Sequence, residues 1–206
     1  MKLDSVHRRI AKHKVCAYKS VSYAAVAVVA GMPPIRLKAN ERVEIYGGLD
    51  REEARRNLVG NWQWSWSADV KRRWTHRLIP NVEAWISRKH DDVGHRLCQV
   101  LTGHGSFDGY LYKWKRKSTG ECQICGTTPD TAEHAVYECD AWHAARCEAN
   151  VYLGATLTVE NTVAMMLSNK KNWRRINGLV EKIMATREEV ERTKERDPFQ
   201  DLAAQL

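Results

Sequence analysis

The spacing of three cysteines and a histidine in residues 121–139, ECQICGTTPDTAEHAVYEC, constrains this chain most strongly. Two residues separate Cys122 from Cys125, eight separate Cys125 from His134, and four separate His134 from Cys139. Zinc binds sulfur and nitrogen ligands tetrahedrally, and a two-residue spacer lets one turn aim both thiolates at the same point. The alternative is ordinary buried cysteines and a core histidine. The spacing favours a zinc site, and four protein ligands would make it structural, because catalytic zinc keeps a position for water.

The residues between these ligands set expectations for the local backbone. Gly126 follows the second cysteine, where a knuckle turn often needs a positive φ that glycine adopts easily. His134 and Cys139 are five residues apart and cannot share one face of an unbroken α-helix. We therefore expect His134 in a short helical turn over residues 132–137, with Cys139 just beyond its end. Cys147 is a second choice of ligand.

Composition indicates a folded, soluble, intracellular protein. The chain has 206 residues, 43% of them hydrophobic, and eight tryptophans. Residues 1–20 lack the apolar segment of a secretory signal, so Cys16, Cys98 and Cys147 are expected to be reduced and mostly buried. The small apolar run 24–31 is far shorter than the ~20 residues of a membrane span, and no membrane partner is expected.

The net charge of +8 is concentrated before the cysteine-rich segment. Lys and Arg outnumber Asp and Glu over residues 71–117, and this block also contains tryptophans and tyrosines. Such a mixture suits phosphate contact combined with base stacking. The alternatives are a solvated face and, for Trp74 and Trp114, a place in the core. The pattern predicts nucleic-acid contacts by Lys71, Arg72, Arg73, Trp74, Arg77, Lys113, Trp114, Lys115, Arg116 and Lys117.

Apolar periodicity predicts a mostly α fold, with strand signals only near residues 151–153 and in the knuckle. Ser20 or Ser22 is expected to cap a small-residue helix that ends at Gly31. A helix beginning at Pro34 is expected to turn its apolar stripe inward; the stripe comprises Ile35, Ala39, Val43 and Tyr46.

The next helix is expected to begin at Asp50. Its tryptophans at 62, 64 and 66 alternate, so either the helix ends near Gly60 or one tryptophan faces a partner. His104, between two glycines, is expected to pack or hydrogen-bond rather than act as a base.

Capping residues mark three helices after the metal motif. Asp140, Thr158, and either Ser168 or Asn169 are expected to begin them. The last helix is expected to bury a stripe formed by Trp173, Ile176, Leu179, Val180 and Ile183. Residues 197–206 resemble a frayed tail.

Four stretches, AYKSVSYAAVAVVAGMPPIRL, RRWTHRLIPNVEAWI, LTGHGSFDGYLYKW and the cysteine motif, resemble in order the C-terminal part of the Pol polyprotein of non-LTR retrotransposons. The similarity is greatest to type-1 elements that insert into arthropod ribosomal RNA genes. The resemblance implies thumb- or connector-like helices over residues 1–49, and a basic, Trp-rich helical region over 50–120. It further implies a zinc motif at 121–140, inserted before C-terminal helices at 141–206.

The same resemblance implies a parent polyprotein with RNA-directed DNA polymerase and endonuclease activities. Its polymerase holds Mg²⁺ with paired aspartates in a Phe/Tyr-x-Asp-Asp turn, whereas Asp91 and Asp92 here follow Lys89 and His90. We therefore expect a piece of a larger protein without a complete active site. Magnesium is expected only in the missing polymerase and endonuclease domains.

The resulting hypothesis is a nucleic-acid-binding module used in target-primed reverse transcription. Its expected partners are the RNA template, the target DNA and the rest of the polyprotein, with no small-molecule substrate, in the nucleus at the integration site. Two alternatives are an endonuclease segment, which would need a carboxylate cluster, and a zinc-stapled domain for structure or protein interaction.

Overall fold

The computed structural model describes residues 2–71 and 73–196. All regular secondary structure among these residues is helical. The α-helices are α1 (Lys2–Lys14), α2 (Tyr23–Val29), α3 (Ile35–Tyr46), α4 (Arg51–Ala68), α5 (Arg73–Leu78), α6 (Val82–Ile86), α7 (His95–Thr102), α8 (Asp108–Lys113), α9 (His143–Leu153), α10 (Val159–Ser168) and α11 (Lys170–Arg196). A π-helical turn at His134–Glu138 and a 3₁₀ turn at Asp140–Trp142 lie between α8 and α9. The mostly α expectation is confirmed, and the described residues contain no strand.

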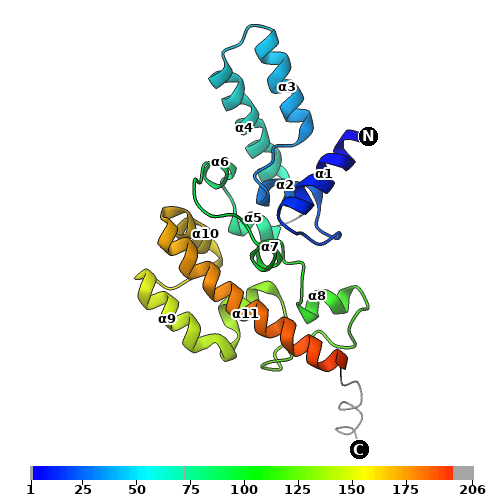
Figure 1. Ribbon diagram of the computed structural model, residues 1–206, viewed down its shortest axis with the longest axis vertical. Helices are drawn as coiled ribbons and strands as arrows, with labels where there is room; N and C mark the ends of the chain where they lie inside the picture. Colours follow the sequence, from blue (N-terminus) through cyan, green and yellow to red (C-terminus); the bar gives the residue numbers. More distant parts are fainter. Residues whose placement is uncertain (1, 72, 197–206) are drawn as a thin grey trace, which may run out of the picture.

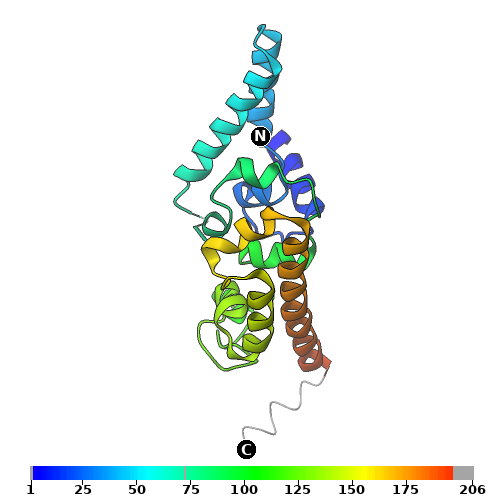
Figure 2. The ribbon, with the colours of Figure 1, turned by 90° about the vertical axis from the view of Figure 1, so that its left-hand side faces the viewer.

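The molecule is elongated, with a projecting helical hairpin at one end (Figures 1 and 2). Helices α3 and α4 form this hairpin, while α1, α2, α5, α6 and α7 surround the middle of the molecule (Figure 1). Helix α11 runs diagonally through the other end, alongside α9 and α10 (Figure 1). None of the described helices combines the length and the apolar character needed to cross a membrane.

Helix α2 is largely buried, and its side chains are small. The Ser22 hydroxyl accepts a hydrogen bond from the Ala25 amide at 3.2 Å, so Ser22 is the cap. All residues from Ala25 to Ala30 are buried, and Gly31 ends the segment with a φ of 61°. Small side chains let neighbouring elements approach this helix closely.

The inward stripe expected for α3 is wrong at its C-terminal end. Val43 is 70% exposed and Tyr46 is 89% exposed, whereas Glu41 is buried and pairs with Lys38 and Arg55. The physical reason is that α3 packs mainly against α4 in the projecting hairpin and has far fewer contacts with α1. An amphipathic stripe therefore has only one narrow partner surface to cover it.

Helix α4 does not end near Gly60 but continues to Ala68. Of its three alternating tryptophans, one is therefore exposed, which was the other alternative. Asp50 caps the helix by accepting from the amides of Glu52 and Glu53. Trp62 and Trp66 are buried one turn apart, while Trp64 is 74% exposed.

The strand expected near residues 151–153 is wrong, because these residues complete α9. The preference of Val151 and Tyr152 for strands is overridden by the helical run that precedes them. Asp140 does not cap α9 either; it begins the 3₁₀ turn, and Trp142 occupies the cap position.

The last two helices begin as the sequence indicates. Thr158 forms a capping box with Asn161 at the start of α10, and the Asn169 side chain accepts from the Asn172 amide at the start of α11. The five-residue apolar stripe expected for α11 is buried throughout. The tail expected at residues 197–206 lies outside the described residues.

Substitution of Gly60 tests the helical assignment of α4. An added Cβ at this exposed mid-helix position meets no heavy atom within 4 Å. Because glycine costs more backbone entropy than alanine in a helix, Gly60→Ala should raise the free energy of unfolding by roughly 0.5–1 kcal/mol in urea denaturation. Gly105→Ala is the control and should destabilise, since its Cβ would lie 2.1 Å from the Gln99 Oε1 atom. Loss of stability in Gly60→Ala would contradict an open helical site.

Candidate metal centre and nucleic-acid interface

The side chains of Cys122, Cys125, His134 and Cys139 converge on one point between α8 and α9. Their ligand atoms all lie within 4.8 Å of one another. Cys122, His134 and Cys139 are almost fully buried, and Cys125 is half-buried. Tetrahedral zinc–sulfur bonds of ~2.3 Å would place sulfurs roughly 3.8 Å apart, so only small adjustments would be needed around an ion.

The first two ligands lie on a tight turn held by its own backbone. The Cys122 amide donates to the Thr127 carbonyl at 2.9 Å, and the Gly126 amide donates to the Cys122 carbonyl at 2.8 Å. Gly126 has a φ of 77°, as the sequence predicts. This turn directs the thiols of Cys122 and Cys125 to the same side.

A π-helical turn brings His134 and Cys139 together. Thr131 precedes it, and its hydroxyl accepts a hydrogen bond from the His134 amide at 3.1 Å. The Cys139 amide donates to the His134 carbonyl at 2.8 Å, which is the i→i+5 bond that defines a π turn. Arg146 then donates to the carbonyl of Cys139 at 2.6 Å. The short turn and the place of Cys139 just after it are confirmed, and the π geometry explains how a five-residue spacing can work.

The thiols differ in their tendency to ionise. Burial raises the pKa of Cys125, but hydrogen bonds with Thr127 and with the neighbouring cysteines outweigh it and lower the pKa to about 6. Burial raises the pKa of Cys139 to about 12, although the Ala141 amide opposes this. Sulfurs this close repel one another as thiolates, whereas a divalent cation would stabilise all of them. This donor set therefore suits a metal ion.

His134 is oriented for the same role. Its Nε2 lies 3.2 Å from the Cys125 sulfur, while its buried Nδ1 lacks a hydrogen-bond partner among the described residues, Glu138 being 3.7 Å away. Cys147, the second-choice ligand, is exposed and lies beside His143 instead. The expected burial of the remaining thiols is wrong for Cys147 and Cys16 and correct for Cys98.

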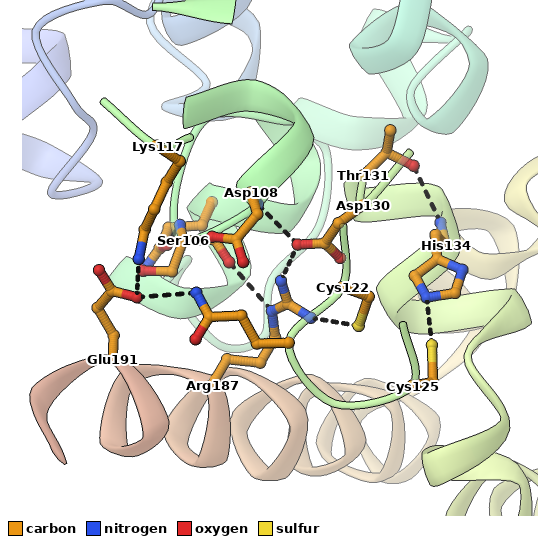
Figure 3. A network of polar contacts seen from close by, with 12 residues as sticks. Ser106, Asp108, Lys117, Cys122, Cys125, Asp130, Thr131, His134, Arg187 and Glu191 are labelled. Atoms are coloured by element: carbon orange, nitrogen blue, oxygen red, sulfur yellow. Dashed lines mark hydrogen bonds and ion pairs between the residues drawn. The ribbon is translucent and has the colours of Figure 1, made fainter. Parts of the chain in front are cut away.

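A buried ion pair ties this centre to α11. Asp130, fully buried, accepts from the guanidinium of Arg187, which also donates to the Ser106 carbonyl at 3.0 Å and lies 3.6 Å from the Cys122 sulfur (Figure 3). The guanidinium also lies 5.5 Å from the centre of the Phe107 ring. Arg187 thus contacts a metal-ligand candidate and the α7–α8 loop at once.

Asp130 also fixes the start of α8. Its carboxylate accepts from the Asp108 amide at 2.6 Å, and its carbonyl accepts from the Gly109 amide at 2.9 Å. A Cβ on Gly109 would lie 2.6 Å from that carbonyl, so the two backbones approach as closely as glycine allows. Lys117 and Gln123 both bind Glu191 of α11 nearby (Figure 3). The position of α8 therefore depends on the cysteine-rich segment.

Relatives of the chain are retrotransposon proteins. The retrovirus-related Pol polyprotein from the type-1 retrotransposable element R1 4 of Nasonia vitripennis is 29% identical over an alignment of 193 residues, covering 83% of this chain and 49% of that protein. A Pol polyprotein from an R1 element of Bradysia coprophila is 34% identical over 101 residues, covering 48% of this chain and 10% of that protein. The chain is a relative of the type-1 retrotransposon Pol polyproteins.

This R1-related chain spans about half the length of the first relative and a small part of the second. A putative 115 kDa protein in the R1DM element of Drosophila melanogaster is 28% identical over 162 residues, covering 67% of this chain and 16% of that protein. No protein-family model and no solved structure matches the chain.

The basic residues singled out in the R1-related sequence fall into two groups. Lys71, Arg73, Lys113, Lys115 and Arg116 are exposed, whereas Arg72 lies outside the described residues. The other two cations bind carboxylates. Arg77 donates to Glu133 and Glu160 at 2.9 Å, and these hydrogen bonds raise the pKa of its guanidinium; Lys117 pairs with Glu191 at 2.6 Å.

The two tryptophans differ in environment. Trp114 is 63% exposed and its ring centroid lies 6.5 Å from that of Tyr110, so its place in the core is excluded. Trp74 is half-buried, and its indole donates to the Val100 carbonyl at 2.7 Å. Gly103 leaves room for this ring, since a Cβ there would approach it to 3.0 Å.

Basic residues from two segments far apart in the sequence, near residues 73 and 113, line two adjoining hollows. One, of about 550 Å³, has Arg73, Trp74 and Lys113 in its wall; the other, of about 740 Å³, has Trp114 and Arg116. Both hollows are lined by Ser20 and Tyr110, so they adjoin beside α8, and together they are here called the α8 groove. Tyr18 and Lys19, which lie far in sequence from the basic block of residues 71–117, line the second of these hollows.

The loop histidine of the α8 groove is a packing residue, as expected. His104 Nδ1 lies 3.0 Å from the Ser20 hydroxyl, and its ring is 4.8 Å from that of Tyr110. Burial, and then the nearby charge of Lys12, lower the pKa of His104.

Asp130 and Arg187 were missed by sequence reasoning, although a signal exists. Arg187 follows Ile183 by four residues and Met184 by three, which places a charge on the buried stripe of α11. A charge in such a position indicates a buried partner, because an isolated buried charge is very costly. Asp130, in the cysteine-rich segment, is that partner.

Removal of the Arg187 guanidinium tests this role. Arg187→Met leaves the Asp130 carboxylate buried without its cation and should lower the free energy of unfolding by ~3–5 kcal/mol in urea denaturation. Arg192→Met, on the exposed side of the same helix, is the matched control and should change it by less than ~0.5 kcal/mol. Equal effects of the two substitutions would contradict a structural role for the buried pair.

Proposed function

We propose that this chain is a zinc-stabilised nucleic-acid-binding region of a retrotransposon polyprotein, acting beside that protein's polymerase. The observation that carries the proposal is the α8 groove, where basic and aromatic residues from segments about forty positions apart line one hollow surface. Exposed cations suit a phosphate backbone, and aromatic rings between them suit stacking on unpaired bases. A single-stranded RNA template or an opened target DNA strand has both features.

The proposed phosphate contacts are the exposed members of the sequence-based set. Lys71, Arg73, Lys113, Lys115 and Arg116 extend from the surface, whereas Arg77 and Lys117 already bind carboxylates. Glu133, the acidic residue in the groove wall, is bound by Arg77. Its negative charge therefore repels a phosphate less than a free carboxylate would.

The proposed metal is zinc, held by Cys122, Cys125, His134 and Cys139. All four positions belong to the protein, which fits a structural ion. The role of the ion is to fix the segment that carries Asp130, and through it the start of α8. The rest of the polyprotein, with magnesium in its polymerase and endonuclease domains, and a nuclear site of action are part of the same proposal.

Substitution of a ligand tests the metal assignment. The wild-type chain should contain one zinc per molecule by elemental analysis, and Cys125→Ser should lose it and melt at a lower temperature, because metal-binding energy is also folding energy here. Cys147→Ser, an exposed thiol outside the cluster, is the matched control and should keep both properties. Full zinc content and an unchanged melting temperature in Cys125→Ser would refute the site.

The salt dependence of binding tests the α8 groove. The Lys113/Lys115/Arg116→Ala variant should bind a fluorescent single-stranded oligonucleotide more weakly, with a shallower slope of log affinity against log salt, by ~0.7 for each lost phosphate contact. Arg36/Arg42/Arg56→Ala removes the same charge from the α3–α4 hairpin and should leave the slope nearly unchanged. An equal loss of slope in both variants would mean that charge, and not the groove, governs binding.

Trp114→Ala separates stacking from stability within the same assay. Because its ring is exposed, the variant should melt normally while binding weakens by ~1–3 kcal/mol. Normal binding together with a lowered melting temperature would assign Trp114 a structural role instead.

A further inference from the structure

A second hollow lies between α9 and α11, on the other side of α11 from α8 (Figure 1). It has a volume of about 470 Å³ and contains none of the residues of the α8 groove. The net charge of residues 118–206 does not indicate a basic groove, because this part of the sequence contains more acidic than basic residues. We call it the α9–α11 groove.

Helical spacing places its cations along one face of α11. Lys171, Arg174, Arg175 and Lys182 all line the groove, with Gly178 between them. Positions 171, 174/175, 178 and 182 recur at intervals of three or four residues and therefore share one side of a helix. The twelve residues from Lys171 to Lys182 span about 16 Å along the axis, which is long enough to follow an extended ligand.

Helix α9 supplies a floor of small residues and one aromatic wall. Ala145 and Ala149 lie beside Glu148 and Tyr152 at the same helical spacing. The Arg175 guanidinium lies 4.4 Å from the Tyr152 ring centre and binds Glu148 at 2.9 Å. These contacts hold a flat cation and a half-exposed ring at the edge of the groove.

The charge of the groove is only partly compensated by carboxylates. Glu148 is the only acidic residue in its lining, against four cations. Arg174 has a carboxylate 3.7 Å away in Asp91, but its own side chain is 67% exposed. Within the described part of the chain, Lys171 and Lys182 form no ion pair with a carboxylate. An anionic ligand would therefore meet several cations that remain in water.

Gly178 lies at the centre of the cation row and has no side chain. It lies inside the long helix α11, where glycine is unfavourable compared with alanine. An added Cβ would meet no heavy atom within 4 Å, so packing within the chain does not require glycine. Glycine does let another molecule approach the helix backbone closely, and here it keeps the centre of the cation row open.

We propose that the α9–α11 groove binds the phosphodiester backbone of a second nucleic-acid strand. The row of cations matches the repeated phosphates of such a strand. The planar guanidinium and the half-exposed tyrosine suit the sugars and bases between them. The choice of nucleic acid over other anions rests on the proposed function of the α8 groove. With one groove beside α8 and a separate one between α9 and α11, a single chain can hold two strands at once.

The test uses the zinc-loaded full chain and two short oligothymidylates, one with a donor and one with an acceptor fluorophore. The wild type should bind both strands and give energy transfer between them. Lys171/Arg174/Lys182→Gln should bind one strand and lose the transfer. Lys113/Lys115/Arg116→Gln should also bind one strand, through the other groove. Arg36/Arg42/Arg56→Gln removes equal charge and should behave as wild type.

Gly178→Leu provides a second variant that changes no charge. Leucine favours helix and fits the open space, so folding should persist while the filled groove loses its strand. Two strands bound by both this variant and the Lys171/Arg174/Lys182→Gln variant would overturn the inference. Displacement of a strand from this groove by polyglutamate at equal charge concentration would also overturn it, because the groove would then prefer acidic peptides.

The outcomes separate the two proposals. A wild type that binds one strand, lost in Lys113/Lys115/Arg116→Gln, refutes the second groove and leaves the proposed function intact. A wild type that binds no strand refutes both. A single strand lost only in Lys171/Arg174/Lys182→Gln keeps the new groove and refutes the α8 groove.

Discussion

The buried pair of Asp130 and Arg187 is the interaction on which the rest of the arrangement depends. Neither charge is tolerable alone in the interior, so the cysteine-rich segment and α11 are bound to each other. Exchange of such a pair for apolar residues is often neutral, which means that its value lies in fixing one geometry more than in net stability. Here that geometry includes a candidate metal ligand, the α7–α8 loop and the first turn of α8.

Helix α11 acts as a common support for every feature with a proposed role. Its first half packs Trp173, Ile176 and Ile183 into the core, and the Trp173 ring centroid lies 5.8 Å from that of the buried Trp85. Its later turns hold the cysteine-rich segment through Arg187 and Glu191, while its early turns present the cation row. A rigid helix shared in this way keeps the two grooves at a fixed separation, which a flexible linker would not do.

The sequence predicted the features that depend on local chemistry. Caps at Ser22, Asp50 and Thr158, the stripe of α11 and the convergence of the four cysteine and histidine side chains follow from spacing and short-range hydrogen bonding. Features that depend on which helices and loops meet in space could not be predicted from the sequence. The exposure of Tyr46 follows from the projection of the hairpin, and the joining of Arg73 with Lys113 in one groove follows from tertiary packing. The periodicity of apolar residues indicates which face of a helix is apolar, but it does not indicate which other element packs against that face.

The π turn at His134–Glu138 determines which parts of the cysteine motif can change length. One residue added to or removed from this turn would rotate Cys139 by about 100° about the helix axis and carry its sulfur away from the other three ligands. The loop between Gly126 and Asp130 lies outside any helix and can absorb an insertion by changing its path. Across diverging copies of such an element, we therefore expect insertions to accumulate in that loop, while the five-residue interval from histidine to cysteine is retained.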